Sequence, residues 1–401
     1  MSHDKKPRPM ALPRLTPYWA GLIFSATRLL PSSFSFIYLL SQGLSIADVS
    51  NARLIQLIAL LLLEVPSGVL ADRFGPRWSL LVSAFVSASW LGIMTVVHDF
   101  PTLVVAELLN AVSLSLFSGS FEVLLRDTHR AKNPMANFGK AQALWIAVAS
   151  IVGAIFATIV SRQAAWALAA VIQVTLFLWL WWDMRQHRVA PSSTPASAPN
   201  AVASLKLCCQ VIRLMPVRLW VSFVASTLVF DIALQFWQPI IVIQGAPAEN
   251  NLLLMVISLV LMAAMSMGNA LEEMAVRHRA IAGVVLAIPL FLVVMESASG
   301  SIRLVFSAIT ICLLVAVSSA LQSRATFLIV HAVRGDAEVT AFSMISALSR
   351  VLSGILIVAV GAFLTAGVSV ALVMIGLLVI LACSLLTVRT LDGGTGTAKA
   401  A

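Results

Sequence analysis

The chain has 401 residues, of which 60% are hydrophobic and only 11% are charged. Soluble globular domains carry about 25% charged residues, so this composition excludes a soluble protein and indicates membrane-spanning helices. The formal net charge of +9 must then lie mostly at the membrane surfaces, because charges are costly in hydrocarbon, and we do not interpret it as a nucleic-acid-binding surface.

Apolar segments follow one another along the whole chain. A helical span needs about 20 such residues, and twelve segments fit, so the sequence predicts an all-α membrane protein of twelve transmembrane helices in two six-helix bundles. We expect the spans at residues 17–40, 53–71, 78–97, 102–125, 139–160, 164–182, 219–243, 252–271, 280–295, 302–327, 340–364 and 368–388.

Basic residues predict the orientation of these spans. Most of the 26 Lys and Arg residues fall in the N-terminal tail, the loops after even-numbered spans or the C-terminal tail. The opposite loops hold only Arg53, Arg162 and Arg303. Because cytoplasmic loops carry the excess of Lys and Arg, we expect both termini to be cytoplasmic.

A charged segment, residues 68–80, separates the second and third spans. Its charges and free backbone groups would lack partners in hydrocarbon, so it must form a tight loop at a membrane surface. Its sequence, G-V-L-A-D-R-F-G-P-R-W-S-L, resembles the G-x-L-A-D-R-x-G-R-K-x-x-L motif of the major facilitator superfamily, with Pro76 at the first basic position. The resemblance implies a transporter of two six-helix bundles that move about a central site.

The same resemblance implies a cytoplasmic gate. In the family the motif's aspartate lies against the start of the eleventh helix, near residue 340 here, where an anion meets the positive end of a helix dipole. The two motif arginines can pair with Asp127 at the end of the fourth span; a solvated loop that only follows the charge bias is the alternative for them. The gate residues expected on this basis are Gly68, Asp72, Arg73, Gly75, Arg77 and Asp127.

Two further stretches resemble one branch of bacterial facilitators. Glu64, Pro66 and Gly68 match a Glu-x-Pro-x-Gly sequence that enters the motif, and residues 118–127 match the end of the fourth helix. Members of this branch are regarded as exporters or have no assigned substrate. The resemblance therefore implies export across the cytoplasmic membrane of a bacterium.

Charged residues also fall deep within the expected spans. Arg28 and Asp231 lie at comparable depths in the first and seventh spans, Glu107 lies in the fourth and Arg350 in the eleventh. A charge at the bilayer centre costs about 2.5–3.5 kcal/mol, so each needs a cavity or a partner. In the family, helices 1, 4, 7 and 10 line the central cavity, which implies that Arg28, Glu107, Asp231 and Arg324 face the substrate or carry protons. Arg350 is a further pathway candidate because of its depth in the eleventh span. A permanent ion pair between Arg28 and Asp231 is the alternative.

One segment has the composition of a linker. Residues 190–200 contain three prolines among Ser and Ala, which favours an extended chain over a packed core. Gly268, Glu272 and Arg277 repeat the spacing of the first motif and support two related halves. We expect an N-terminal bundle at residues 1–187, a cytoplasmic linker at 188–216 and a C-terminal bundle at 217–401.

These features together predict a secondary active transporter, acting as a monomer, that exports a small organic compound by alternating access in exchange for protons. A proton-coupled uptake permease for a metabolite is the first alternative and a membrane-embedded enzyme the second. The enzyme is disfavoured because the sequence has no Asp-rich metal motif, His cluster or nucleophile elbow. No Walker sequence is present either, so we expect neither ATP, a cofactor nor a nucleic acid as a direct partner.

Overall fold

The computed structural model describes residues 17–128, 134–186, 217–273, 288–289, 292–293, 297–332 and 338–395, and all regular structure within them is helical. The helices are α1 (Pro17–Arg28), α2 (Ser35–Ser41), α3 (Ile46–Phe74), α4 (Pro76–Met94), α5 (Phe100–Thr128), α6 (Pro134–Ile159), α7 (Arg162–Gln186), α9 (Val217–Ile243), α10 (Asn251–Glu273), α12 (Gly300–Ala332), α13 (Glu338–Thr365) and α14 (Val370–Thr395).

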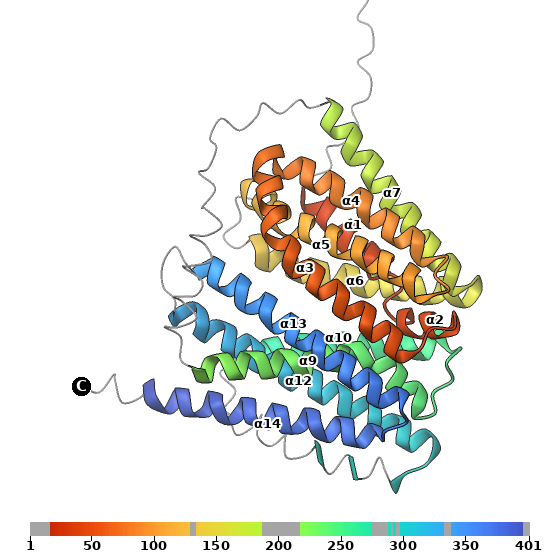
Figure 1. Ribbon diagram of the computed structural model, residues 1–401, viewed down its shortest axis with the longest axis vertical. Coiled ribbons are helices and arrows are strands. Elements are labelled where there is room, and N and C mark those ends of the chain that lie inside the picture. Colours follow the sequence, from red (N-terminus) through yellow and green to blue (C-terminus); the bar gives the residue numbers. More distant parts are fainter. Residues whose placement is uncertain are drawn as a thin grey trace, which may run out of the picture.

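The helices form two groups that lie side by side (Figure 1). In the first group, here named the N-terminal half, α4 packs on α5 and α7, and α3 packs on α5. In the second group, the C-terminal half, α9 packs on α12 and α14, and α10 packs on α12. The main contacts between the halves join α3 to α13 and α6 to α10. The expected linker lies outside the described residues, so the domain boundaries stay a prediction.

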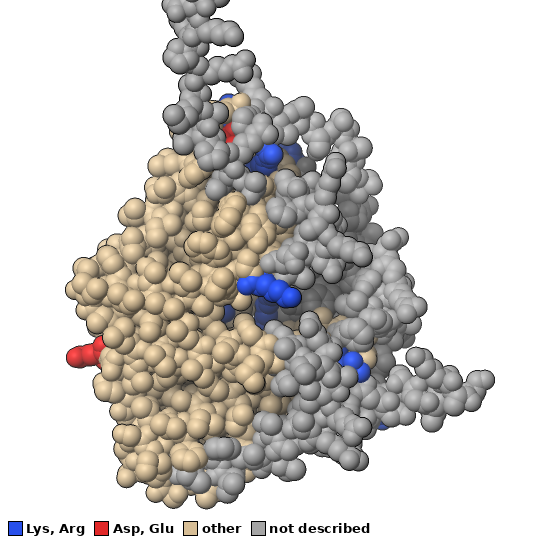
Figure 2. Space-filling view, turned by 180° about the vertical axis from the view of Figure 1, so that it is seen from behind, with Lys and Arg blue, Asp and Glu red and all other residues tan. Residues whose placement is uncertain are grey.

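The outer surface has the character of a membrane protein. Seven of the described helices are long and apolar enough to cross a bilayer. Large apolar side chains such as Leu62 and Ile159 are exposed, at 68% and 76%. Figure 2 shows a broad uncharged area on the described part of one face, with few charged residues along it. The all-α membrane fold is confirmed; the ninth expected span, residues 280–295, lies mostly outside the described residues.

The first expected span, at residues 17–40, is not one continuous helix. Residues 29–34 form consecutive turns between α1 and α2, with Pro31 in the middle. Proline lacks a backbone N–H and clashes with the preceding helical turn, which breaks a helix. Short turn bonds replace the helical ladder there, including Ser32 N–H to the carbonyl of Leu29 at 3.1 Å.

The second expected span begins earlier than residue 53. Ser45 and Asp48 form a capping box: each side chain accepts a hydrogen bond from the other residue's backbone N–H, at 3.0 Å and 2.9 Å. A capping box satisfies two of the free N–H groups at a helix start, so α3 begins at Ile46. Arg53 is therefore about two turns inside the helix. The expectation from the charge pattern that it lies in a loop is wrong.

The turn between α3 and α4 is as short as the motif predicts. Gly75 ends α3 with φ of 90° and donates its N–H to the carbonyl of Ala71 at 2.9 Å. Glycine adopts this backbone conformation without the strain of a side chain. Pro76 follows at the first position of α4, where a missing N–H costs nothing.

Candidate functional site: the interface between the two halves

The two halves meet closely where α3 crosses α13. A Cβ atom placed on Gly361 would lie 2.1 Å from the Ser50 hydroxyl oxygen, and one on Gly354 would lie 2.8 Å from a methyl of Leu54. Small residues allow helix backbones to approach this closely in membranes. This contact involves the beginning of α3 and the end of α13, a region named here the closed end, which the charge pattern predicts to be periplasmic.

Farther along α3, fewer contacts to the C-terminal half are found among the described residues. Leu57 still lies against Gly354, but Glu64, two turns on, is exposed. No described side chain lies within 4 Å of a Cβ placed on Gly68. The described contacts between α3 and the C-terminal half are therefore concentrated at the closed end.

A second contact at the closed end involves Arg162, which begins α7. Its Nε donates to the Asn251 side-chain oxygen at 2.8 Å, and its Nη2 donates to the Ala248 carbonyl. Both acceptors belong to the turn and helix start that follow α9. This arginine thus joins the halves, a role that its position in an expected loop did not indicate.

Arg28 is buried inside the N-terminal half. Its Nη1 donates to the hydroxyls of Ser87 at 2.9 Å and Ser113 at 3.0 Å, and its Nη2 donates to the Asn110 side-chain oxygen. The guanidinium carbon lies 4.4 Å from the ring centre of Trp90, a cation–π arrangement. All these partners come from α4 and α5, so the described structure does not contain the Arg28–Asp231 ion pair considered above.

Glu107 joins the Arg28 cluster through an amide. Asn110, one turn along α5, donates its Nδ2 to a Glu107 carboxylate oxygen at 3.0 Å while its oxygen accepts from Arg28. Arg28 also attracts the Glu107 charge. The structure therefore brings together two of the expected pathway residues, with Asn110 between them.

Arg53 is a site residue that the sequence analysis missed. Its Nη1 donates to the Gln56 side-chain oxygen, while its buried Nε has no acceptor among the described residues. Its positive charge acts both on Glu107 in α5 and on Asp231 in α9. Arg53 is thus within electrostatic reach of one carboxylate from each half. The capping-box pattern at residues 45–48 is the signal that would have placed it inside the helix.

The surroundings of Asp231 differ from those of Glu107. Its carboxyl lies beside the Ser353 hydroxyl, whose oxygen makes no hydrogen bond of good geometry within the described part of the chain. The charge of Arg350, on the exposed side of α13, acts both on Asp231 and on Glu64 across the interface. The acid of the C-terminal half is therefore within electrostatic reach of two arginines, one from each half.

The remaining expected residues are spread more widely. Arg324 is partly buried on α12. In the gate motif, Arg73 is exposed with its guanidinium 5.4 Å from the Phe74 ring centre, and Arg77 is partly buried at the start of α4. The side chains of Asp72 and Asp127 lie outside the described residues, so the gate pairing stays a prediction.

Comparison with known proteins decides the family. The sequence pattern of the Major Facilitator Superfamily matches residues 19–355, most of the chain. The chain belongs to the major facilitator superfamily. This facilitator is therefore a transporter and not an enzyme, and the membrane-embedded enzyme is set aside.

Two individual proteins are similar to this facilitator. The uncharacterized MFS-type transporter YxaM of Bacillus subtilis (strain 168) is 24% identical over 208 residues, a match that spans 51% of this chain and 52% of YxaM. The crystal structure of a mutant of the nucleoside transporter NupG matches 94% of this chain and 99% of its own, with a TM-score of 0.70 and 11% identity. At that identity the likeness shows the fold alone.

Proposed function

We propose that this facilitator is a secondary active transporter that exports a small organic compound across the bacterial cytoplasmic membrane by alternating access, coupled to protons. The observation that carries the proposal is the placement of two acids, Glu107 and Asp231, inside membrane helices of opposite halves. Acids at such depth are costly and rare, and those that occur often mark ion or proton pathways. Substrate and ion sites of such transporters lie near the midplane between the two repeats.

The electrostatics around these acids support proton coupling. Arg53 acts on both carboxylates, so a proton on either acid removes one of its two attractions. Protonation of Glu107 leaves Arg53 attracted to Asp231 in the C-terminal half, whereas protonation of Asp231 leaves it attracted to Glu107 in its own half. Either event changes the interaction between the halves. A proton arriving at the interface can in this way alter which arrangement of the halves is favoured.

Export rests on the branch resemblance of Glu64, Pro66, Gly68 and residues 118–127. In this proposal the gate motif closes the cytoplasmic end when the opposite end opens, both termini are cytoplasmic and the monomer is the working unit. Proton-coupled uptake of a metabolite is the second candidate. The shared fold with a nucleoside transporter is the reason to include uridine among the compounds tested.

Energised inside-out membrane vesicles test the proposal. A panel of small organic compounds that includes uridine is added while a pH-sensitive dye reports the acid interior. We expect an exported compound to accumulate and to release protons from the vesicles. Glu107→Gln and Asp231→Asn should each abolish this release while the protein remains inserted, because neither amide can carry a proton.

Asp99→Asn is the matched control, since Asp99 is an exposed acid just before α5 that accepts the Thr102 N–H at 2.8 Å. Its variant should transport like the parent. Accumulation only in right-side-out vesicles would replace export by uptake. Unchanged proton release in both Glu107→Gln and Asp231→Asn would show that these acids do not couple transport to protons.

A further inference from the structure

The side chain of Gln238 in α9 joins the C-terminal half to the break between α1 and α2. Its Oε1 accepts hydrogen bonds from the backbone N–H groups of Phe36, at 2.9 Å, and Ile37, at 3.3 Å. Its Nε2 donates to the carbonyl of Ser32 at 2.7 Å. All three partners are backbone groups of the N-terminal half, and Gln238 itself is only 3% exposed.

These backbone groups need a partner from outside their own helix. The first N–H groups of any helix have no intrahelical acceptor. Phe34, the residue that precedes α2, makes no side-chain capping bond, because a phenyl group has no acceptor. Gln238 therefore caps α2 from the opposite half of the protein.

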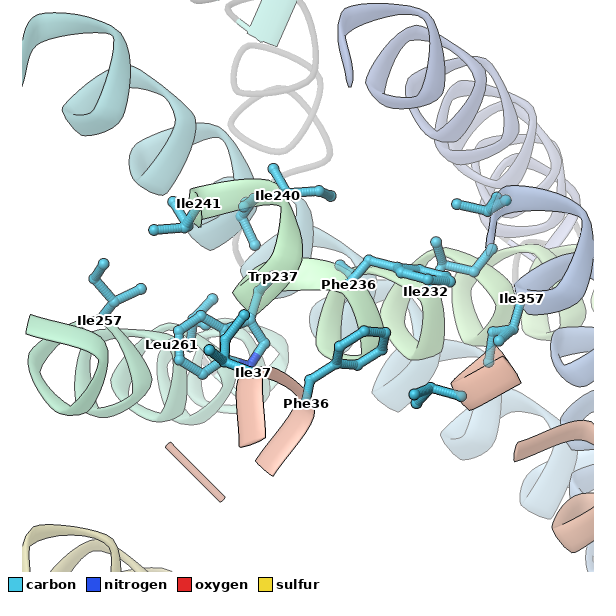
Figure 3. Packing of buried hydrophobic residues seen from close by; sticks show 14 of the residues in the cluster. Phe36, Ile37, Ile232, Phe236, Trp237, Ile240, Ile241, Ile257, Leu261 and Ile357 are labelled. Atoms are coloured by element: carbon cyan, nitrogen blue, oxygen red, sulfur yellow. The ribbon is translucent and has the colours of Figure 1, made fainter. Parts of the chain in front are cut away.

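The cap lies largely among buried apolar side chains. Phe36 and Ile37 are buried in α2, which packs on α9 (Figure 3). The rings of Phe36 and Phe236 are 6.0 Å apart between centres. A buried N–H without an acceptor is costly, so the closed end depends on an acceptor at this position. Phe36 and Ile37 belong to the same buried apolar cluster as Ile232, Phe236, Trp237, Ile240, Ile257 and Leu261.

We propose that Gln238 is the latch of the closed end. It sets the relative populations of two states of this facilitator, one in which this end is closed and one in which it is open. When the halves separate at that end, the three hydrogen bonds must break, and water can reach Phe36, Ile37 and Ser32 instead. Gln238 thus stabilises one orientation and not the other, which is the condition for shifting a two-state equilibrium. The inference rests on the alternating access proposed above, but on neither the direction of transport nor the coupling ion.

The latch requires an amide of this length. Glutamine offers an acceptor to two N–H groups and a donor to one carbonyl at the same time. Leucine fills a similar volume and offers neither. Glutamate keeps the acceptor but loses the donor to Ser32, so it should weaken the latch only in part.

Accessibility of a cysteine at Ser33 tests the latch. Ser33 is fully buried in the same break, and its hydroxyl has no partner among the described residues. Ser33→Cys is introduced after the four native cysteines, Cys208, Cys209, Cys312 and Cys383, are replaced by serine. Right-side-out vesicles are then treated with a membrane-impermeant maleimide, which reaches only the face that the charge pattern assigns to the periplasm.

We expect slow labelling with Gln238 present, labelling several-fold faster in Gln238→Leu, and an intermediate rate in Gln238→Glu. Gln244→Leu is the matched control: this glutamine lies just after α9 at the same end, and its side chain makes no hydrogen bond to the described residues. That variant should label like the parent.

Labelling of inserted Gln238→Leu at the parent rate would overturn the latch. If Gln238→Leu does not insert, Gln238→Glu decides in its place: faster labelling supports the latch, and the parent rate refutes it. Labelling needs no substrate or proton gradient. A failed proton-release test with Glu107→Gln or Asp231→Asn therefore remains distinguishable from a failed latch.

Discussion

Arg28, which is buried, and Arg53, which is partly buried, are accommodated in two different ways. Arg28 distributes its charge over hydroxyl and amide oxygens and over the Trp90 ring, all within one half. Arg53 acts on carboxylates from both halves and retains an N–H without an acceptor among the described residues. A cation held within one half can stay fixed while the halves move, whereas a cation between them must change its interactions. We infer that Arg28 serves mainly the stability of the N-terminal half and Arg53 the transport cycle.

Replacement of Arg28 by alanine should destabilise the protein. The change leaves the Asn110 oxygen buried without its donor, and such a loss costs about 1–3 kcal/mol. Arg28→Lys should recover part of the loss, because an ammonium keeps the charge but cannot reach three acceptors in a planar fork. Thermal unfolding of the detergent-solubilised variants measures both effects.

A double-mutant cycle separates this arrangement from a pair with Asp231. Arg28→Ala combined with Asn110→Ala should show a coupling of about 0.5–3 kcal/mol, as residues in one network do. Arg28→Ala combined with Asp231→Ala should be additive within about 0.5 kcal/mol. A strong coupling between Arg28 and Asp231 instead would support an ion pair between these two residues across the halves.

At the scale of helices, the closed end is built by the crossing of α3 and α13. Gly354 and Gly361 are spaced two turns apart on α13, so they lie on one face of the helix. Each lacks a side chain that would keep α3 at a greater distance from α13. The α1–α2 break adds a short helix that depends on α9 for its cap. Close backbone approach and a cap supplied by the opposite half therefore both act at the same end.

Gly361→Leu should wedge this end open. A Cβ at this position already lies 2.1 Å from the Ser50 hydroxyl oxygen and 2.7 Å from its Cβ, so a leucine side chain cannot fit unless the helices separate. We expect a higher labelling rate at Ser33→Cys from the periplasmic face in the cysteine-free protein, with insertion retained.

Gly376→Leu is the control for this substitution, because no described atom lies within 4 Å of a Cβ at that exposed position of α14. It should leave labelling unchanged. Parent-like labelling in Gly361→Leu would mean that α3 and α13 separate by another route than the one inferred from their crossing.

At the scale of the whole molecule, the distribution of basic residues over the two ends of the fold predicts one orientation in the membrane. The closed end contains the turns after α2, α9 and α13, which carry few basic residues, whereas the motif turn lies at the opposite end of α3 with Arg73 and Arg77 nearby. Cytoplasmic loops hold the excess of Lys and Arg. We therefore expect the closed end to face the periplasm.

Reporter fusions test this orientation. Fusions at Gly75, Pro195 and Gly393 should all report the cytoplasm, and fusions at Gly245 and Gly367 should report the periplasm. A periplasmic signal at Pro195 would contradict the division into six plus six helices, and a reversal of all five would invert the assignment of the closed end.

Local properties of the sequence were sufficient for the class of protein and for its motif turn. Apolar length and the cost of charge in lipid are properties of one segment against its solvent, so the spans and the turn at Gly75 and Pro76 could be predicted without knowledge of their neighbours. Two helix boundaries that differ from the expected spans also have local signals in the sequence. Pro31 marks the break after α1, and the capping box of Ser45 and Asp48 marks the true start of α3.

Only the tertiary structure could decide which polar groups meet. Arg28 and Ser87 are 59 residues apart in the sequence, and Ser32 and Gln238 are 206 apart. The hydropathy pattern that predicts each span carries no information on which spans lie close together in space. A buried donor takes whichever acceptor the packing of helices brings within about 3 Å. For that reason the sequence pointed to Arg28 as a charge in need of a partner, while the fold determined that its partners are Ser87, Ser113 and Asn110.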